Sequence, residues 1–573
     1  MNNATERLKV MRNFYRKNHG IYYTSKDKHG NEQEHYFCED MFISQCMIDI
    51  ITNEMSVIVD LYNGIGYNQI EFSRGEIDRD IVKKLKKYGL SLPDTAQNAY
   101  YVQDILHDSE KISRCLYVHS SLGYTFLDDQ LVFLASTPIG ADNQAKSISD
   151  YLGKATVKPK GTLKSWKSVI RNEVIGHPTL ELALTIGASS PIVHILRKER
   201  MLFSENPIWG IVGESSTGKT TVLRLMASIF GSPEEGCGII GDCNSTENAF
   251  YKRLSNSIGM PLIVDEATGK TNWNFADIIY NLSKGQDKDR CSPDGELKQR
   301  TEFSGTVVIS GEKSILDECI SNSGTYARME ELSLNWTDSA EHAERLTAGL
   351  KQNYGTAVYS LLEWILKVYR KYPYVFDTAF FREKKKLNQK LPIEKNIDHR
   401  IYNIFAGVLV TARILNKALG LKLNIQTMRE LLLKQHQKKG ADCDEAQRLF
   451  DAVTEYAVRN GSKFPRASKD KMQLSSLDIW GEYTAGNGGK SYLWIPQYTM
   501  KKIAEENSLT NYKKYFPILY ERGQMLRPEK DRFLGKHKLR GNQVKCYQFV
   551  LNEISSNITK NLNDTKHILL PED

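Results

Sequence analysis

The chain has 573 residues, too many for one ordinary core, and this length predicts three or four domains. Hydrophobic residues make up 40% of it and charged residues 25%, a balance that excludes a mostly disordered or a collagen-like protein. The net charge of +8 favours a polyanionic partner.

Targeting and metal-binding signals are missing from the sequence. No run approaches the roughly 18 apolar residues of a membrane span, and the charged start MNNATERLKVMRNFYRKNHG lacks the apolar region of a secretory signal. We therefore expect a cytoplasmic protein with no membrane partner. The nine cysteines are scattered without a C-x-x-C pair, and the twelve histidines offer no closely spaced ligand pair. We expect neither a disulfide framework nor a protein-held transition metal.

The first part of the chain predicts a mixed α/β region followed by a linker. Residues 1–153 combine short strand-like runs, polar turns and helical stretches. Residues 154–170 form a basic linker, which either contacts phosphates or only stays soluble. The apolar run Leu180–Leu196 reads as a helix interrupted at Pro191.

A phosphate-binding loop is the sharpest feature of the sequence. The segment GESSTGKT, from Gly213 to Thr220, matches G-x-x-x-x-G-K-[ST]. A buried strand is predicted before it (208–212) and a helix after it (221–230), so backbone N–H groups would face the phosphates of ATP. Lys219 would reach the β- and γ-phosphates, and the hydroxyl of Thr220 would bind Mg²⁺. The predicted ATP-binding residues of the loop are Gly213, Ser216, Thr217, Gly218, Lys219, Thr220 and Thr221.

Two carboxylates end the next apolar strand, PLIVDE. Asp265 fits the Mg²⁺ shell, and Glu266 fits the residue that orients and polarises the attacking water. An adjacent acid pair suits hydrolysis more than phosphoryl transfer to a small acceptor.

Three further polar residues are candidates for sensing or stabilising the γ-phosphate. Ser310 ends the apolar strand GTVVIS. Arg328 precedes another strand-like run; in ring ATPases an arginine here reaches the neighbouring subunit's ATP, and the alternative is an intramolecular salt bridge. Arg400 follows Asp398, which we expect to cap a helix, and either reaches the phosphates from the helical lid or stays at the surface.

A charged segment between the acid strand and GTVVIS predicts a hairpin. Its Pro-Asp-Gly sequence is a turn signal, and its flanks carry Lys288, Arg290, Lys298 and Arg300. Hexameric helicases insert a hairpin into the central pore at this position, and a surface hairpin is the alternative.

The C-terminal part follows a helical region (341–458) and predicts a winged helix over residues 470–555. Its order is strand, helix, helix, strand, strand, with the last two strands flanking Gly535. In a winged helix one helix enters a groove of DNA and the wing contacts phosphates. The candidate DNA-binding residues here are Lys513, Lys514, Arg532, Lys536, Lys538 and Arg540; residues 556–573 read as a tail.

The segments WGIVGESSTGKTTVLRLMASIFG, LIVDEA, LSKGQDKDR, VVISGE and TYARMEEL resemble the ATPase core of replicative helicases of staphylococcal mobile elements. These helicases, carried by cassette chromosomes and pathogenicity islands, are similar to minichromosome-maintenance (MCM) helicases. The resemblance implies an α/β multidomain protein with an AAA+ P-loop core (171–340), a helical insert and lid, and a winged helix. It also implies a self-loading homo-hexamer that uses ATP and Mg²⁺ and translocates on single-stranded DNA, with possible partners among the element's other replication proteins. Ser310 departs from the asparagine usual in MCM helicases at the sensor position.

Three functions remain open on the sequence alone. The first is an ATP-driven DNA helicase that initiates replication of a mobile genetic element. The second is an ATP-switched DNA-binding regulator or defence ATPase that does not unwind DNA. The third, an origin-binding protein with a degenerate ATPase, is disfavoured by the intact set of Lys219, Asp265 and Glu266.

Overall fold

The computed structural model places the chain in two compact units, Met1–Ile315 with Arg328–Leu431 and Leu316–Ala327 with Leu432–Asp573. Each unit is described separately below. The residues that the structure describes are 7–8, 14–142, 148–236, 239–242, 257–266, 274–286, 302–318, 325, 328–392, 396–442, 445–466, 479–486, 490–507, 509, 512–529, 532–539 and 542–551.

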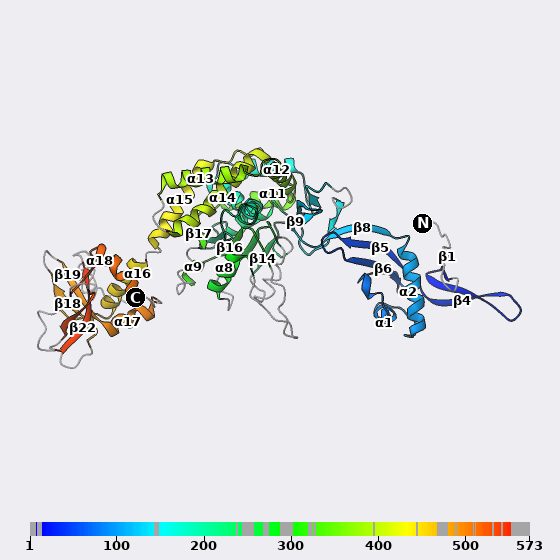
Figure 1. Ribbon diagram of the computed structural model, residues 1–573, viewed down its shortest axis with the longest axis horizontal. Coiled ribbons are helices and arrows are strands. Elements are labelled where there is room, and N and C mark those ends of the chain that lie inside the picture. The colour runs from blue at the N-terminus through cyan, green and yellow to red at the C-terminus, as the bar shows by residue number, and fades with distance from the viewer. Residues whose placement is uncertain are drawn as a thin grey trace, which may run out of the picture. The chain divides into compact units, whose positions relative to one another are not determined.

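The N-terminal region is built on three small sheets (Figure 1). The first is antiparallel in the order β1-β2-β3-β4: β1 (Arg7–Leu8), β2 (Phe14–Lys17), β3 (Gly20–Lys26) and β4 (Glu32–Glu39). The second runs in the order β12-β8-β5-β6-β7: β5 (Met41–Asp49), β6 (Met55–Tyr62), β7 (Tyr67–Ser73), β8 (Arg114–His119) and β12 (Asp150–Tyr151). The third contains β9 (Gly123–Leu127), β10 (Gln130–Leu134) and β11 (Pro138–Ile139).

Two helices, α1 (Ile81–Lys86) and α2 (Ala96–Glu110), close the core of the second sheet. Val102, Ile105 and Leu106 recur at helical spacing on α2 and are fully buried with Val57 and Val59 of β6. The predicted mixed α/β character of this region is therefore confirmed.

The centre of the first unit is a five-stranded parallel sheet in the order β14-β15-β16-β13-β17. Its strands are β13 (Ile208–Val212), β14 (Ile240–Asp242), β15 (Leu262–Asp265), β16 (Val307–Gly311) and β17 (Met329–Leu332). The accompanying helices are α3 (Leu163–Glu173), α4 (Pro178–Ala188), α5 (Ser190–His194), α6 (Lys219–Ala227), α8 (Phe275–Lys284) and α9 (Ile315–Glu318). Every residue of β13 is buried, as expected for a parallel strand covered on both faces.

The apolar run before this sheet forms buried helices with a break where the sequence predicts one. Residues 180–188 of α4 are all buried, and Pro191 lies in the first turn of α5, which continues into a π-helical turn (Ile195–Glu199). Among the described residues, no single helix is long and apolar enough to cross a membrane. Only the bent pair Pro178–Ala188 and Ser190–Glu199 passes a test of length and composition, and its apolar side chains lie in the protein core.

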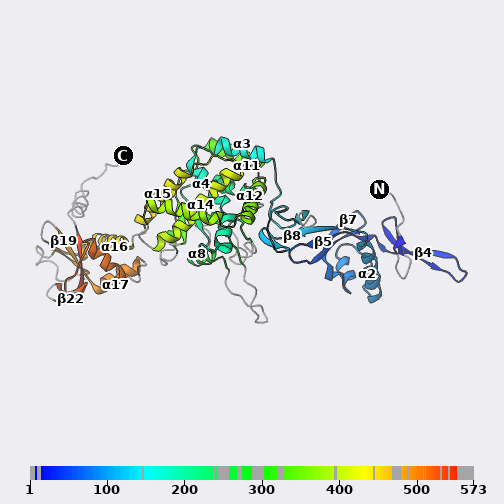
Figure 2. The same cartoon turned by 45° about the horizontal axis from the view of Figure 1, so that its top comes forward.

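Six longer helices follow, and several of them gather over the parallel sheet (Figure 2). They are α11 (Ala340–Gln352), α12 (Ala357–Lys371), α13 (Val375–Lys390), α14 (Asn396–Ala418), α15 (Ile425–Asp442) and α16 (Glu445–Arg459). Gly420 follows the end of α14 with a φ of 66°, the left-handed conformation that favours glycine after a helix. The expectation that Asp398 caps this helix is wrong, because α14 already begins at Asn396.

A buried carboxylate ties α13 to α14 and α15. Glu383 is fully buried and forms ion pairs with Arg413 (2.5 Å) and Arg429 (2.6 Å). Burial alone would raise the pKa of Glu383, but the two guanidinium groups outweigh it and hold this pKa below its ordinary value.

We expect Glu383→Ala to destabilise the first unit by about 3–5 kcal/mol, because it leaves two guanidinium groups without their partner. Because the pKa of Glu383 is lowered on folding, its stabilisation is present above its unfolded pKa and is lost as the pH falls through the folded one. Urea unfolding at pH 7 and at decreasing pH measures both effects. A variant as stable as wild type would contradict the prediction.

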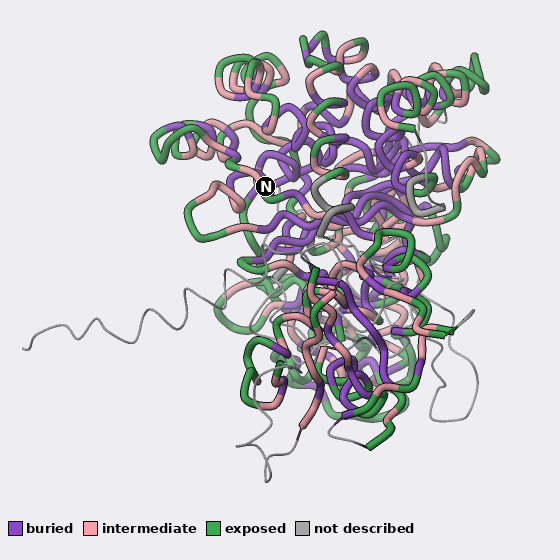
Figure 3. The backbone as a smooth tube through the Cα atoms, turned by 90° about the vertical axis from the view of Figure 1, so that its left-hand side faces the viewer, coloured by how far each residue is buried: buried purple, intermediate pink, exposed green. Residues whose placement is uncertain are grey.

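The second unit combines α16 with a small antiparallel sheet (Figure 1). Figure 3 shows the burial of the described residues along the backbone. The sheet runs β18-β19-β22-β20, with β21 also paired to β22: β18 (Glu482–Ala485), β19 (Ser491–Pro496), β20 (Met525–Leu526), β21 (Leu534–Leu539) and β22 (Asn542–Leu551). Between β19 and β20 lie α17 (Gln497–Glu506), a 3-10 turn (Tyr512–Tyr515) and α18 (Phe516–Glu521). The predicted order of strand, two helical segments and strands is therefore present.

The last hairpin differs from the prediction in its turn. Gly535 lies inside β21, opposite Cys546, rather than between two strands. A Cβ on Gly535 would lie 2.7 Å from the ring of Pro528, so glycine allows a close approach here rather than a turn.

Candidate nucleotide-binding site and nucleic-acid surfaces

The P-loop connects the end of β13 directly to the start of α6. Gly213, Ser216 and Gly218 have φ values of 150°, 70° and 86°. A Cβ on Gly218 would also lie 2.9 Å from the hydroxyl of Thr337. Glycine is therefore required at 218 both by the backbone conformation and by the close approach of another segment.

Lys219 points back across the loop. Its Nζ donates hydrogen bonds to the carbonyl oxygens of Gly213 and Glu214, both at 2.7 Å. A lysine held in this way stands at the mouth of the loop, where a phosphate group can replace the two carbonyl acceptors. The helix that starts at this lysine directs the first N–H groups of α6 to the same place.

The acid strand brings its first carboxylate to the P-loop. Thr220 Oγ1 donates a hydrogen bond of 3.2 Å to Oδ2 of Asp265, whose residue is only 7% exposed. A hydroxyl and a carboxylate oxygen side by side are the oxygen ligands that Mg²⁺ prefers. Thr220 and Asp265 therefore fit the metal role predicted for them.

Glu266 has an unusual backbone conformation. Its φ is 52°, in the left-handed region that a glutamate rarely adopts, and its side chain is exposed. Its N–H donates to Oγ of Ser310 and to Oδ1 of Asp265, both at 3.0 Å. These bonds hold the backbone of Glu266 in this conformation at the end of the acid strand.

The register of β16 with its two neighbouring strands places Ser310 between the P-loop strand and the acid strand. On β16 it lies beside Ile211 of β13, and it follows Ile309, which pairs with Val264 of the acid strand. Its hydroxyl donates to Asp265 and accepts from the N–H of Glu266. In this chain the side chain that we expected to sense the γ-phosphate therefore holds the two acids together.

The back of the P-loop is covered by the segment that follows β17. The N–H of Trp336 donates to the carbonyl of Thr217 at 3.1 Å, and the hydroxyl of Thr179 donates to the carbonyl of Trp336 at 3.4 Å. The loop is thus fixed to α4 through residues 336–337. The sequence pattern gave no signal for this contact.

Arg328 and Arg400 meet at a single carboxylate. Arg328 Nη2 lies 3.3 Å and Arg400 Nη1 3.5 Å from Oε1 of Glu205. The guanidinium of Arg328 also lies 4.9 Å from the ring centre of Tyr280. A hydrogen bond with Lys284 lowers the pKa of this tyrosine. The intramolecular salt bridge that we held as the alternative for Arg328 is thus present.

These arginines lie near the amino ends of the parallel strands, whereas the chain's own P-loop lies at their carboxyl ends. Arg328 precedes β17, whose first residue, Met329, pairs with Ile208 at the start of β13. The P-loop instead follows Val212, at the end of β13. Four steps along a strand separate the two ends by about 13 Å.

The amino ends of the strands also carry the root of the predicted charged hairpin. Gln286 and Glu302 form an antiparallel bridge. Arg197 donates to the carbonyls of Lys284 (2.6 Å) and Ser204 (2.8 Å) and is only 7% exposed. The four residues predicted to contact DNA in this hairpin, Lys288, Arg290, Lys298 and Arg300, lie outside the described residues.

Lysines gather around a hollow of the second unit. This hollow has a volume of about 850 Å³ and is lined by Tyr498 and Lys501 of α17, Tyr512 and Lys513 of the 3-10 turn, and Lys545 of β22. Lys545 pairs directly with Lys536 across the hairpin. Like charges opposite each other destabilise a sheet, so this arrangement favours an anionic partner.

The other predicted DNA-binding residues lie nearby in the chain. Lys514, Arg532, Lys536 and Lys538 are exposed, whereas Arg540 lies outside the described residues. Lys536 and Lys538 alternate with partly buried His537 on β21 and therefore share one face of the hairpin. Tyr498 and Lys501, which line the hollow, were not among the predicted residues, although Lys501 lies in a stretch that the sequence predicts to be helical.

The strand order, the glycine-rich loop and the acid pair at one sheet edge are together typical of a P-loop nucleoside-triphosphate-binding core. Residues 14–302, about half of the chain, match the family described as "Domain of unknown function (DUF927)". The chain therefore belongs to that family.

A solved structure titled "SCCmec type IV Cch - active helicase" has a similar fold. The TM-score is 0.70 at 20% sequence identity, and the match covers 95% of this chain and 98% of that chain. The predicted resemblance to helicases of staphylococcal cassette chromosomes is thus confirmed for the fold. A search of curated protein sequences found no match.

Proposed function

We propose that the chain is an ATP-driven DNA helicase that initiates replication of a mobile genetic element. The observation that carries the proposal is a set of hydrogen bonds beside the P-loop. These bonds join Thr220, Asp265, Glu266 and Ser310. The fold shared with the SCCmec type IV Cch helicase supports the finer assignment. The protein would act in the cytoplasm.

Each residue of the site has its own role in the proposed hydrolysis of ATP. Lys219 would release the two loop carbonyls and bind the β- and γ-phosphates, and Thr220 and Asp265 would hold Mg²⁺. Mg²⁺ held there would supply neutralisation of charge on the phosphates. Glu266 orients a water molecule for attack on the γ-phosphate, and Ser310 fixes the backbone of this glutamate.

The position of the arginines supports a ring. Arg328 and Arg400 lie at the end of the strands opposite to their own P-loop, and we infer that they serve a site on another subunit. We therefore propose an AAA+ homo-hexamer in which each pair of arginines contacts the ATP of the neighbour. Arg328 would stabilise charge in the transition state.

Two surfaces are proposed for DNA. The charged hairpin rooted at Gln286 and Glu302 would follow one strand through the pore. The second unit would bind duplex or origin DNA as a winged helix, with the Tyr512–Tyr515 turn and α18 toward a groove and the hairpin of β21 and β22 on phosphates.

Strand displacement on a tailed duplex, with ATP and Mg²⁺, tests the proposal directly. Wild type should separate the strands and Lys219→Ala should not, and the tail that supports unwinding gives the polarity. DNA-stimulated ATP hydrolysis without unwinding would instead favour the ATP-switched regulator or defence ATPase.

We expect Lys513→Gln combined with Lys545→Gln to weaken duplex binding and its dependence on salt. For each phosphate that the variant no longer binds, the slope of log K against log salt should fall by about 0.9. Lys502→Gln is the matched control, because Lys502 lies on α17 beside Lys501 but does not line the hollow. Fluorescence anisotropy between 50 and 200 mM salt, roughly the range in which such contacts show, measures the slope. An unchanged slope would contradict DNA binding at this hollow.

A further inference from the structure

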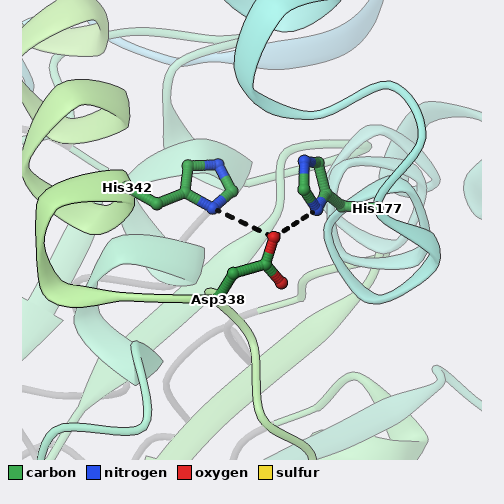
Figure 4. A group of neighbouring side chains, drawn as sticks. All are labelled: His177, Asp338 and His342. Carbon is green, nitrogen blue, oxygen red and sulfur yellow. Dashed lines mark ion pairs between the residues drawn. The ribbon is translucent and has the colours of Figure 1, made fainter.

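Two histidines and an aspartate from separate segments converge behind the P-loop (Figure 4). His177 is the residue that precedes α4, Asp338 lies just before the cap of α11, and His342 lies in the first turn of that helix. Nδ1 of His177 lies 3.0 Å and Nδ1 of His342 3.9 Å from the same oxygen, Oδ2 of Asp338. The three ligand atoms all lie within 4.8 Å of one another.

The second ring nitrogen of His342 fixes its orientation. Nε2 lies 2.8 Å from the backbone carbonyl of Glu173, which can only accept a hydrogen bond. Nε2 therefore carries the proton, and in the neutral ring Nδ1 presents a lone pair to Asp338. A histidine whose other N–H donates to a carbonyl is the usual outer-shell arrangement of a metal ligand.

An ion pair between His177 and Asp338 does not account for all three groups. His342 is only 4% exposed, and its Nδ1 lies 3.9 Å from the Asp338 oxygen, beyond hydrogen-bond distance, while its Nε2 lies 3.8 Å from Oε2 of Glu173. A cation between the three atoms would satisfy all of them at once.

The distances suit a small tetrahedral ion. With metal–nitrogen bonds of about 2.0 Å, two ligands of a tetrahedral ion lie about 3.3 Å apart. The measured separations from Asp338 are 3.0 and 3.9 Å, on either side of that value. Asp338 has a side chain that is 73% exposed, so solvent can reach the ion and supply the fourth ligand.

We propose that His177, Asp338 and His342 bind one Zn²⁺ ion, with water in the remaining position. Two imidazole nitrogens and one carboxylate favour zinc over Mg²⁺ or Ca²⁺, which prefer sets of oxygen ligands. The ion would fasten the segment after β17 to the start of α4. Because Trp336 of that segment is bonded to Thr217, the zinc would also stiffen the back of the P-loop.

Calorimetric titration of the full-length, chelator-treated protein with ZnCl₂ tests the site, in buffer with excess Mg²⁺. We expect one tight Zn²⁺ per chain, at least about tenfold weaker binding in Asp338→Asn and His342→Ala, and a melting temperature raised by Zn²⁺ only where the site is intact. His29→Ala is the matched control, because His29 is exposed and lies far along the chain from the site. Lys219→Ala should also bind Zn²⁺ like wild type.

If His342→Ala does not fold, Asp338→Asn alone still tests the site. Asp338 is exposed and asparagine has nearly the same shape, so this variant should fold like wild type. Equal Zn²⁺ affinity in wild type and Asp338→Asn, or no tight Zn²⁺ in wild type, would overturn the proposal. Either result leaves the ATPase assignment to be judged by strand displacement.

Discussion

Glu266→Gln is expected to reduce ATP hydrolysis by about 10²–10⁴-fold while leaving ATP binding within a few fold of wild type. Glutamine keeps the size of the side chain and the backbone N–H, which donates to Ser310 and Asp265. It removes only the negative charge that, in the proposed mechanism, orients and polarises the attacking water. Turnover of ATP, compared with equilibrium binding of a fluorescent ATP analogue, separates the two effects.

Glu312→Gln is the control for this prediction. Glu312 is also exposed beside the P-loop and accepts a hydrogen bond of 2.8 Å from Ser215, but it does not follow the acid strand. Its variant should keep most of the activity. Unchanged turnover in Glu266→Gln would remove this residue from the mechanism.

Arg328→Ala is expected to lower ATP hydrolysis by about 10³–10⁵-fold, the range found when a stabilising arginine is lost from phosphoryl transfer. Because Arg328 lies at the end of the strands opposite its own P-loop, we also expect two inactive variants to complement each other. Mixed with Lys219→Ala protein, the inactive variant should regain part of the activity, because an intact P-loop then meets an intact arginine across a subunit boundary.

Arg459→Ala serves as the control for this experiment. Arg459 is 75% exposed on α16 and forms an exposed i,i+4 ion pair with Glu455, so its loss should change little. If the mixture of Arg328→Ala and Lys219→Ala stays inactive while wild-type subunits exchange, Arg328 does not act on a neighbour.

Local patterns could indicate the candidate phosphate site because its parts are close in the chain or ordered by parallel strands. The motif around Lys219 contains its own glycines, and an apolar strand that ends in Asp265 must reach the same sheet edge. The similarity of the fold to helicases of staphylococcal cassette chromosomes could also be predicted from local patterns. The short segments that carry this resemblance all lie in or beside the parallel sheet.

Contacts between distant segments could not be predicted in the same way. Nothing in the sequence around Glu205 indicates that it binds both Arg328 and Arg400, because this requires the start of β13, the start of β17 and α14 to meet. The pair Asp338 and His342 has the i,i+4 spacing of a helix face and offered a signal. Its partner His177 comes from another helix, so the group becomes visible only in the fold.

The buried guanidinium of Arg197 has a consequence for the proposed helicase. It joins the end of α8 to the segment before β13, and Lys284, whose carbonyl it binds, also contacts Tyr280 beneath Arg328. In the proposed ring, the residues that would contact a neighbour's γ-phosphate are therefore joined by direct contacts to the residues beside the bridge of Gln286 with Glu302. Loss of that phosphate would reach the base of the hairpin through these few side chains.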